Sequence, residues 1–380
     1  MRLNSGFEGA EIAMATEAMG ASISASCGWD GLYVGFRCLA SDLGATLDLA
    51  ADILINPAFP DSEWRRVHAQ TLAALRAERD SADSRAYRAL LKALYGPAHP
   101  YRTPLGGTEE TVGGLEIKDL EAFHARSLVP GRASVVVAGD VDPDAVAEEL
   151  DRRLAGWRGA DVEPPPLSVA GLSPHPRILL LDRPGAPQAV VRAGHRGIAR
   201  LDPDFDRLIV FNQILGGQFT SRLNEKLREE RGFTYGVRSQ LDCRRAPGPF
   251  SIGASLQSDR LAEAIDEIRR ELRAILEERP PTQAELDDAR RSLIEGQPRH
   301  LETPSALVSR YGGLLVHGLP AEHEATFAER LAEVDRDSLI EAARAAIHPD
   351  ALVVVVVADA AQVRDRLETL DWARVEVIED

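Results

Sequence analysis

The sequence predicts an α+β protein of two homologous domains, each an α/β sandwich in which helices pack on a mainly antiparallel sheet. Three observations predict this fold class. A length of 380 residues suits two domains better than one. Strand-length and helix-length segments follow one another in pairs along both halves. One helix–strand unit also occurs twice, once in each half.

The repeated unit is the firmest of these observations. Residues 119–140 read DLEAFHARSLVPGRASVVVAGD, and residues 338–359 read SLIEAARAAIHPDALVVVVVAD. Leu120, Pro130 and Asp140 recur at one constant offset of 219 residues, without a gap. Each copy predicts an amphipathic helix, a proline that stops it, a buried valine-rich strand and an acidic turn. Duplication of a domain explains this better than chance.

A proline-rich stretch divides the chain. Five prolines lie within residues 162–177, which indicates a surface linker. We therefore expect an N-terminal domain at 1–161 and a C-terminal domain at 178–380. At the repeat offset, the first strand of the second half has its counterpart before Met1. We accordingly expect the first domain to be N-terminally truncated, without its opening pair of strands.

The expected elements follow from hydrophobic periodicity and from breaker residues. A capping box, TQAE at 282–285, marks one helix start clearly. For the first half we expect a helix at 7–19, strands at 21–27 and 31–38, helices at 41–54, 61–81 and 83–94, and then the repeated unit. For the second half we expect strands at 178–182 and 187–194, helices at 203–216 and 221–231, strands at 233–241 and 249–255, and helices at 260–277, 282–297, 303–317 and 322–331.

Composition excludes several classes of function. A net charge of −16 argues against nucleic-acid binding. The longest apolar run, ALVVVVVA at 351–358, is too short to cross a membrane, and we identify no signal peptide. The three cysteines, Cys27, Cys38 and Cys243, are too scattered for a disulfide scaffold or a thiolate metal site. We interpret the chain as a cytoplasmic protein.

No complete catalytic motif is present in the sequence. No two of the nine histidines lie three or four residues apart, the spacing that places two metal ligands on one helical face. The nucleophile-elbow, P-loop and dinucleotide-binding glycine patterns are also missing. We therefore predict no metal ligands and no cofactor on this chain.

One pair of polar residues stands out. The segment NEKLREERGFTYGVRSQ, 224–240, predicts a helix that ends at Gly232 and a strand after it. Arg228 would lie in the last helical turn and Tyr235 on the strand. Two such donors can stabilise an oxyanion or bind a peptide carbonyl group. Without a nucleophile or metal they cannot cleave a bond. From these residues alone, the simpler interpretation is structural: an exposed arginine near a helix end and a half-buried tyrosine on a strand.

Several separated segments resemble one peptidase family. They include ILGGQFTSRLNEKLREERGFTYGV at 214–237, LYGPAHPYRTPLGGT at 94–108 and VPGRASVVVAGDVD at 129–142. Together they resemble the pitrilysin/insulinase-type zinc metallopeptidases, or inverzincins, in the branch of the mitochondrial processing peptidase and its bacterial relatives. The resemblance covers nearly the whole chain in the family's order. It implies the duplicated α/β sandwich described above.

The resemblance also implies roles for particular residues. In the family, an H-x-x-E-H motif and a second glutamate hold a zinc ion, and an arginine–tyrosine pair from the C-terminal domain binds substrate and the developing oxyanion. Arg228 and Tyr235 match that pair and its spacing. The H-x-x-E-H position falls before Met1, and the position of the second glutamate is Ala74. The resemblance therefore implies a chain without catalytic zinc that is inactive alone.

The resemblance further implies a heterodimer with a homologous H-x-x-E-H subunit. That partner would carry the zinc, both subunits would enclose an unfolded peptide, and Arg228 and Tyr235 would complete the partner's active site. Gly216, Gly217 and Phe219 lie where non-catalytic subunits carry a substrate-binding loop. Three alternatives remain open: a structural subunit like the core proteins of the respiratory cytochrome bc complex, a homodimeric peptide-binding protein without proteolysis, and an active zinc protease whose start is displaced.

Overall fold

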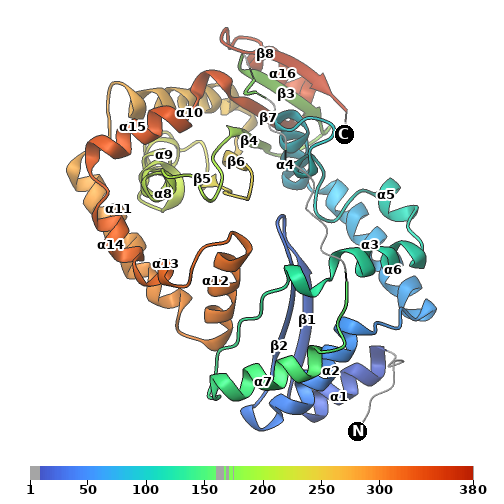
Figure 1. Cartoon of the computed structure of the whole chain (residues 1–380). Coiled ribbons are helices and arrows are strands. Elements are labelled where there is room, and N and C mark those ends of the chain that lie inside the picture. Colours follow the sequence, from blue (N-terminus) through green and yellow to red (C-terminus); the bar gives the residue numbers. More distant parts are fainter. Residues whose placement is uncertain (1–8, 160–166, 168–170, 174, 380) are drawn as a thin grey trace. The chain divides into compact units, whose positions relative to one another are not determined.

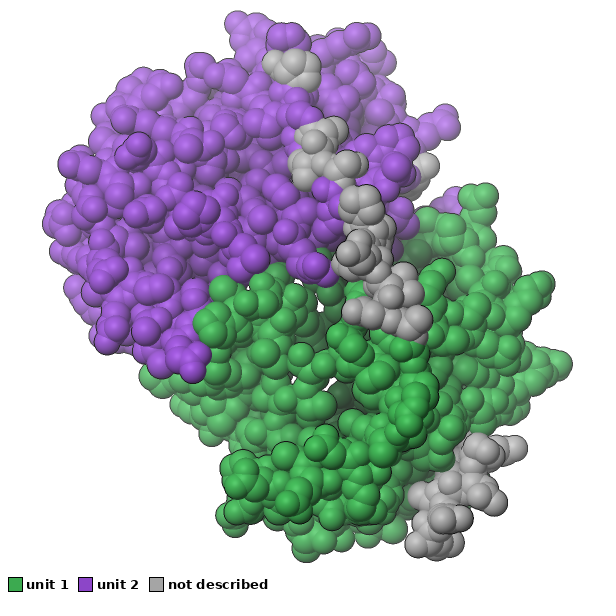
Figure 2. All heavy atoms as spheres, in the orientation of Figure 1, with its two compact units in different colours: residues 1–76, 105–166, 298–321 green, residues 77–104, 167–297, 322–380 purple. Residues whose placement is uncertain are grey.

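The computed structural model describes residues 9–159, 167, 171–173 and 175–379. These residues form two compact units (Figures 1 and 2). Unit 1 comprises residues 1–76, 105–166 and 298–321, and unit 2 comprises residues 77–104, 167–297 and 322–380. The expected linker at 162–177 lies largely outside the described residues, so the expected domain boundaries stay predictions.

Unit 2 is built on a six-stranded sheet in the order β5-β6-β4-β7-β3-β8. Three of the strand pairs, β5–β6, β6–β4 and β4–β7, are antiparallel, whereas β7–β3 and β3–β8 are parallel. The expected α+β class, with helices on a mainly antiparallel sheet, is thereby confirmed in unit 2. The strands are β3 (Arg177–Asp182), β4 (Ala189–Arg196), β5 (Val237–Leu241), β6 (Pro249–Leu256), β7 (Val353–Ala358) and β8 (Arg374–Ile378).

The valine run of β7 occupies the centre of unit 2, and all six of its residues are buried. Successive side chains of a strand point to opposite faces of the sheet. Val354 and Val356 accordingly join the larger core on one face, while Val353, Val355 and Val357 join the core on the other. A continuous apolar run is what a strand covered on both faces requires.

Helices cover both faces of this sheet. The larger core includes buried residues of the helices that follow β4 and β6, and the smaller core receives Ala86 and Leu90 from α4. α4 contacts β4 and β7, although it comes from the first half of the sequence (Figure 1). The helices of unit 2 include α4 (Ala82–Leu94), α8 (Phe205–Asn212), α9 (Arg222–Asn224), α10 (Leu261–Leu276), α11 (Gln283–Gly296), α13 (Glu322–Ala325), α14 (Phe327–Ala332), α15 (Arg336–Ala346) and α16 (Ala360–Leu367).

Unit 1 contains a two-stranded antiparallel sheet and mainly helices. The expected elements are present here to within a few residues, with one exception. The described strands and α-helices are α1 (Gly9–Ala18), β1 (Ser22–Cys27), β2 (Leu32–Arg37), α2 (Leu43–Ile55), α3 (Asp61–Asp80, whose last residues belong to unit 2), α5 (Glu109–Gly113), α6 (Ile117–Ser127), α7 (Pro143–Leu154) and α12 (Pro304–Val316).

The exception is the buried valine strand expected in the first copy of the repeat, and that prediction was wrong. Residues 133–138 form no strand, and Val135 and Val137 are 52% and 38% exposed. In the second copy, β7 is hydrogen-bonded between β3 and β4. In the first copy, no described strand is hydrogen-bonded to residues 133–138, since β1 and β2 pair with each other. An extended segment without neighbouring strands has no partners for its backbone groups and does not become a strand.

Other differences are local. The expected helix at 322–331 is divided into α13 and α14. The helix expected at 203–216 is α-helical only to Asn212 and continues as a π-helix, η4 (Gln213–Gly217). The capping box before α11 is confirmed, since Thr282 and Glu285 each accept a backbone hydrogen bond from the other. None of the helices within the described ranges is long and apolar enough to span a membrane.

Candidate functional site

Arg228 lies on the short helix that ends at Gly232, as predicted, but the last turn is wider than an α-helix. After α9 the backbone continues as a π-helix, η5 (Glu225–Glu230). The Arg231 N–H donates to the carbonyl of Lys226, five residues back, over 3.1 Å. Gly232 then takes a φ of +64°, a left-handed conformation that favours glycine, and the helix ends. Such widened turns are frequent at functional sites.

The structure brings two of the predicted site residues into contact. The Arg228 guanidinium carbon lies 4.1 Å from the centroid of the Phe219 ring. Phe219 is 65% exposed, so one face of the cation is held by the ring while the assembly remains open to solvent. The carboxylate of Glu229 lies 3.5 Å from Arg228 Nε, which is long for a hydrogen bond. Arg228 is therefore oriented by the Phe219 ring, and its ion pair with Glu229 is a long one.

Tyr235 is not on a strand, so that part of the prediction was wrong. It lies two residues before β5 and is 90% exposed. Thr234 explains the difference, because its hydroxyl donates to the Ser255 carbonyl over 2.7 Å and accepts from the Gly236 N–H over 3.1 Å. These side-chain bonds make a turn where the strand was expected. Within the described residues, no hydrogen bond or ring contact joins Tyr235 to Arg228.

Asn224 holds this corner together, and sequence reasoning missed it. Its side chain is buried, accepts from the Val237 N–H over 3.1 Å and donates to the Val237 carbonyl over 2.9 Å. It also donates to the Ser221 hydroxyl. The amide thus fastens the start of β5 to the helix that carries Arg228. No sequence signal distinguishes it from an exposed helix asparagine.

Replacing Asn224 by alanine is expected to destabilise unit 2 by about 1–3 kcal/mol, because two buried backbone groups of Val237 lose their partners. Urea unfolding monitored by circular dichroism measures this change. Asn56→Ala is the matched control, since Asn56 is exposed and bonds only within its own helix end. An unchanged unfolding midpoint for Asn224→Ala would contradict the assigned role.

The two predicted glycines, Gly216 and Gly217, end η4, and only Gln218 separates them from Phe219. A Cβ atom on Gly216 would lie 2.5 Å from Ser239 Oγ and 2.6 Å from Ser239 N, so only glycine allows this helix to pack on β5. A Cβ on Gly217 would lie 2.8 Å from Gln213 Oε1. Both glycines therefore have a packing role that positions Phe219, and a substrate contact by either stays a prediction.

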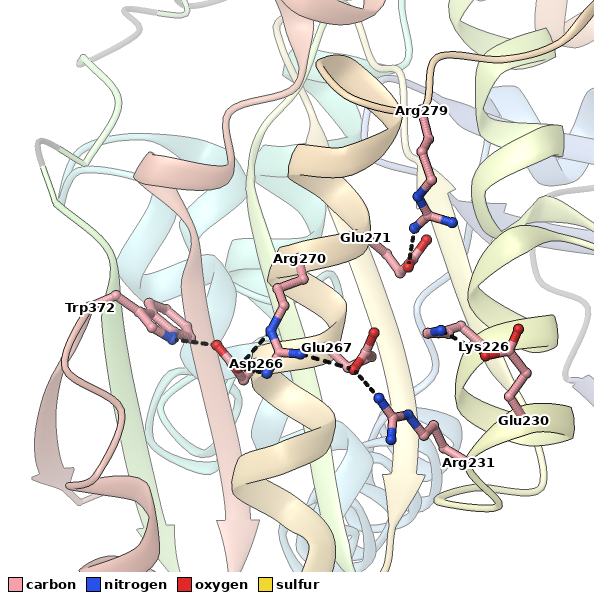
Figure 3. Close-up of polar contacts among 9 residues, drawn as sticks. All are labelled: Lys226, Glu230, Arg231, Asp266, Glu267, Arg270, Glu271, Arg279 and Trp372. Atoms are coloured by element: carbon pink, nitrogen blue, oxygen red, sulfur yellow. Dashed lines mark hydrogen bonds and ion pairs between the residues drawn. The ribbon is translucent and has the colours of Figure 1, made fainter.

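Charged side chains line α10 and the neighbouring η5 helix, which carries Arg228 (Figure 3). The buried carboxylate of Glu267 pairs with Arg231 at 3.3 Å, at the end of η5. Lys226 and Glu230 pair at 2.7 Å along η5 itself, and their hydrogen bond raises the pKa of Lys226. Glu271, also buried, pairs with Arg279 at 2.5 Å. The basic neighbours of Arg228 are thus engaged with carboxylates.

The start of the helix is fixed by a bidentate ion pair. Arg222 donates from Nε to one oxygen of Glu285 over 2.5 Å and from Nη2 to the other over 2.7 Å. Burial alone would raise the pKa of Glu285, but hydrogen bonds from Arg222 and Thr282 outweigh it and lower that pKa to about 2. This pair joins α9 to the capped start of α11.

The residues that this chain presents do not fit the family's zinc ion. Ala74 lies on an exposed position of α3 and carries no ligand atom. The described residues contain no group of three or more His, Cys, Asp or Glu side chains arranged to hold a metal ion.

Comparisons with known proteins find one family model and several similar sequences. A family model described as the peptidase M16 inactive domain matches residues 114–293. An uncharacterized zinc protease of Mycobacterium leprae is 32% identical over 308 residues, which cover 80% of this chain and 68% of that protein. The non-peptidase homolog YmxG of Helicobacter pylori is 27% identical over 289 residues, covering 74% of this chain and 64% of that protein.

A solved structure has the same fold. The crystal structure of a peptidase M16 inactive domain from Pseudomonas fluorescens matches with a TM-score of 0.85 and 27% identity, covering 94% of this chain and 86% of that one. The chain therefore belongs to the M16, or pitrilysin, family of peptidases, as a non-catalytic member.

Proposed function

We propose that this chain is the non-catalytic subunit of a two-subunit zinc metalloendopeptidase. It binds an unfolded peptide and supplies Arg228 and Tyr235 to the zinc site of a homologous H-x-x-E-H subunit. The zinc of that partner would provide the nucleophilic water and polarise the scissile carbonyl. This chain contributes no metal ligand and is inactive alone.

The observation that carries the proposal is the way Arg228 is presented. Its guanidinium stacks on an exposed phenylalanine, its helix is held by a buried asparagine and a buried glutamate, and its basic neighbours are paired. A cation held in one orientation at the surface is suited to bind an oxygen atom from outside the chain. A purely structural subunit has no need of such an arrangement, which disfavours that alternative.

The phenol of Tyr235 suits the same chemistry. It is 90% exposed and no described residue accepts or donates a hydrogen bond to it. A phenol and a guanidinium that both reach the carbonyl oxygen would stabilise the negative charge that develops there during hydrolysis. The free thiols of Cys27, Cys38 and Cys243 suit the reducing cytoplasm, where we place the complex.

Affinity purification from the native host, followed by mass spectrometry, tests the partnership. We expect one H-x-x-E-H protein in stoichiometric amount. The double variant Arg228→Ala/Tyr235→Phe should retain that protein, because the proposal assigns these side chains to the substrate rather than to subunit contact. Recovery of the chain only with itself would contradict the heterodimer and favour a homodimeric peptide-binding protein. Recovery with a large complex free of proteolysis would favour a structural subunit.

A further inference from the structure

A pocket of about 460 Å³ lies within unit 2, at one end of the six-stranded sheet. β4 runs antiparallel to β7, and β3 runs parallel to β7. The last residue of β4, Arg196, and the first residue of β3, Arg177, therefore lie at the same end of the sheet. Both arginines line the pocket, and its described lining includes no aspartate or glutamate.

Arg196 is a buried cation without a counterion. The residue is 8% exposed, and no described residue forms an ion pair or a side-chain hydrogen bond with it. Arg177 Nε is likewise buried and has no hydrogen-bond partner. Burial lowers the pKa of Arg196 below its ordinary value. Burying a charge without a partner is costly, so the arrangement is incomplete until an anion enters.

His195, which also lines the pocket, adds no further positive charge to it. His195 donates from Nδ1 to the Arg196 carbonyl over 2.8 Å, and its Nε2 accepts from the His348 N–H over 3.0 Å. Burial lowers the pKa of His195 to about 4, so this ring is a neutral wall.

The remaining lining decides which anion fits. Leu94, Leu172 and Ala351 give the pocket an apolar wall beside the two arginines. We propose that the pocket binds a small organic carboxylate, whose oxygens contact Arg196 and Arg177 and whose apolar group packs on this wall. Guanidinium groups bind carboxylates through paired, charge-assisted hydrogen bonds. An inorganic anion would satisfy only the charged half of the pocket.

Thermal unfolding of the full chain with sodium hexanoate tests the proposal. At saturating hexanoate we expect the midpoint to rise by about 3 °C relative to sodium chloride of equal ionic strength. Inorganic phosphate should give a smaller rise. An N-acetylated tripeptide with a free carboxyl end, compared with its amidated form, distinguishes a peptide end from a free carboxylate as the source. Equal midpoints in hexanoate and chloride, or an equal rise with phosphate, would overturn the proposal.

Variants connect the effect to the pocket. Arg196→Met should remove the hexanoate response and raise the midpoint in chloride, because an unpaired buried charge is lost. Arg196→Lys should keep part of the response, and Arg177→Met should weaken it even if Arg196→Met does not fold. Arg364→Met is the control, since Arg364 is exposed and paired with Glu368. A full hexanoate response in Arg196→Met or in Arg177→Met would refute the site.

Discussion

Replacing Arg228 by alanine is expected to lower kcat/KM of the assembled peptidase by about 10²- to 10³-fold, the range found when one oxyanion donor is removed. The reason is that Arg228 is oriented on Phe219, and its ion pair with the exposed Glu229 is long, at 3.5 Å, so its charge is available to the substrate. Peptide hydrolysis by the reconstituted complex measures this loss. The amount of copurified partner should not change.

Tyr235→Phe should lower kcat/KM by a similar factor. It keeps the exposed ring but removes the hydroxyl that would donate a hydrogen bond to the oxyanion. If both donors act on one oxygen, the double variant loses less than the product of the two single losses. Arg364→Ala, which removes an exposed arginine on α16, should leave turnover unchanged. Full activity of both single variants would refute the proposed supply of these residues to the partner.

The division of the loss between kcat and KM reports what the two residues bind. A donor that contacts only the developing oxyanion lowers kcat, whereas one that grips the ground-state peptide raises KM. Phe219→Ala offers an intermediate case. It removes the ring that orients Arg228 but leaves the cation, so we expect a smaller loss than for Arg228→Ala.

Local sequence signals predicted the elements of unit 2 well, because each signal describes a nearby interaction. The capping box at Thr282 needs only its sequence neighbours to form, and the valine run marks β7 as a strand buried on both faces. Arg228 was also placed correctly near a helix end, since Gly232 supplies the left-handed residue that stops the helix. The pairing of Arg228 with Phe219 required the widened turns of η4 and η5, which no periodicity indicates.

The errors arose where a distant partner decides the local structure. Thr234 reads as a strand residue until the Ser255 carbonyl is placed beside it. The valines at 133–138 read as a buried strand, yet a strand also needs neighbours that supply hydrogen bonds. Asn224 reads as an exposed helix residue until β5 is seen to bond to it. The hydrophobic periodicity of α4 predicts an apolar face, but it does not predict that this face packs on β4 and β7.

The second large expected effect is on stability, and it concerns Arg244, which attaches α4 to the rest of unit 2. Its side chain is 2% exposed and pairs with Asp242. It also donates to the Tyr87 hydroxyl of α4 over 3.0 Å and lies over the Tyr101 ring, 4.7 Å from the centroid. Burial opposes the charged form, but the hydrogen bond to Asp242 prevails and raises the pKa of Arg244. One arginine thus joins the segment 77–104 to the loop between β5 and β6.

Arg244→Met is accordingly expected to destabilise unit 2 by about 3–5 kcal/mol, because Asp242 and Tyr87 both lose a partner inside the protein. Urea unfolding measures the loss, and limited proteolysis should show earlier cleavage within 77–104. Adding Asp242→Asn should recover part of the stability, since the carboxylate left without a partner is then neutral. Arg364→Met, on the surface, should change the free energy of unfolding by less than about 1 kcal/mol. A loss for Arg244→Met no larger than for this control would mean that α4 is held by its apolar face alone, through Ala86 and Leu90.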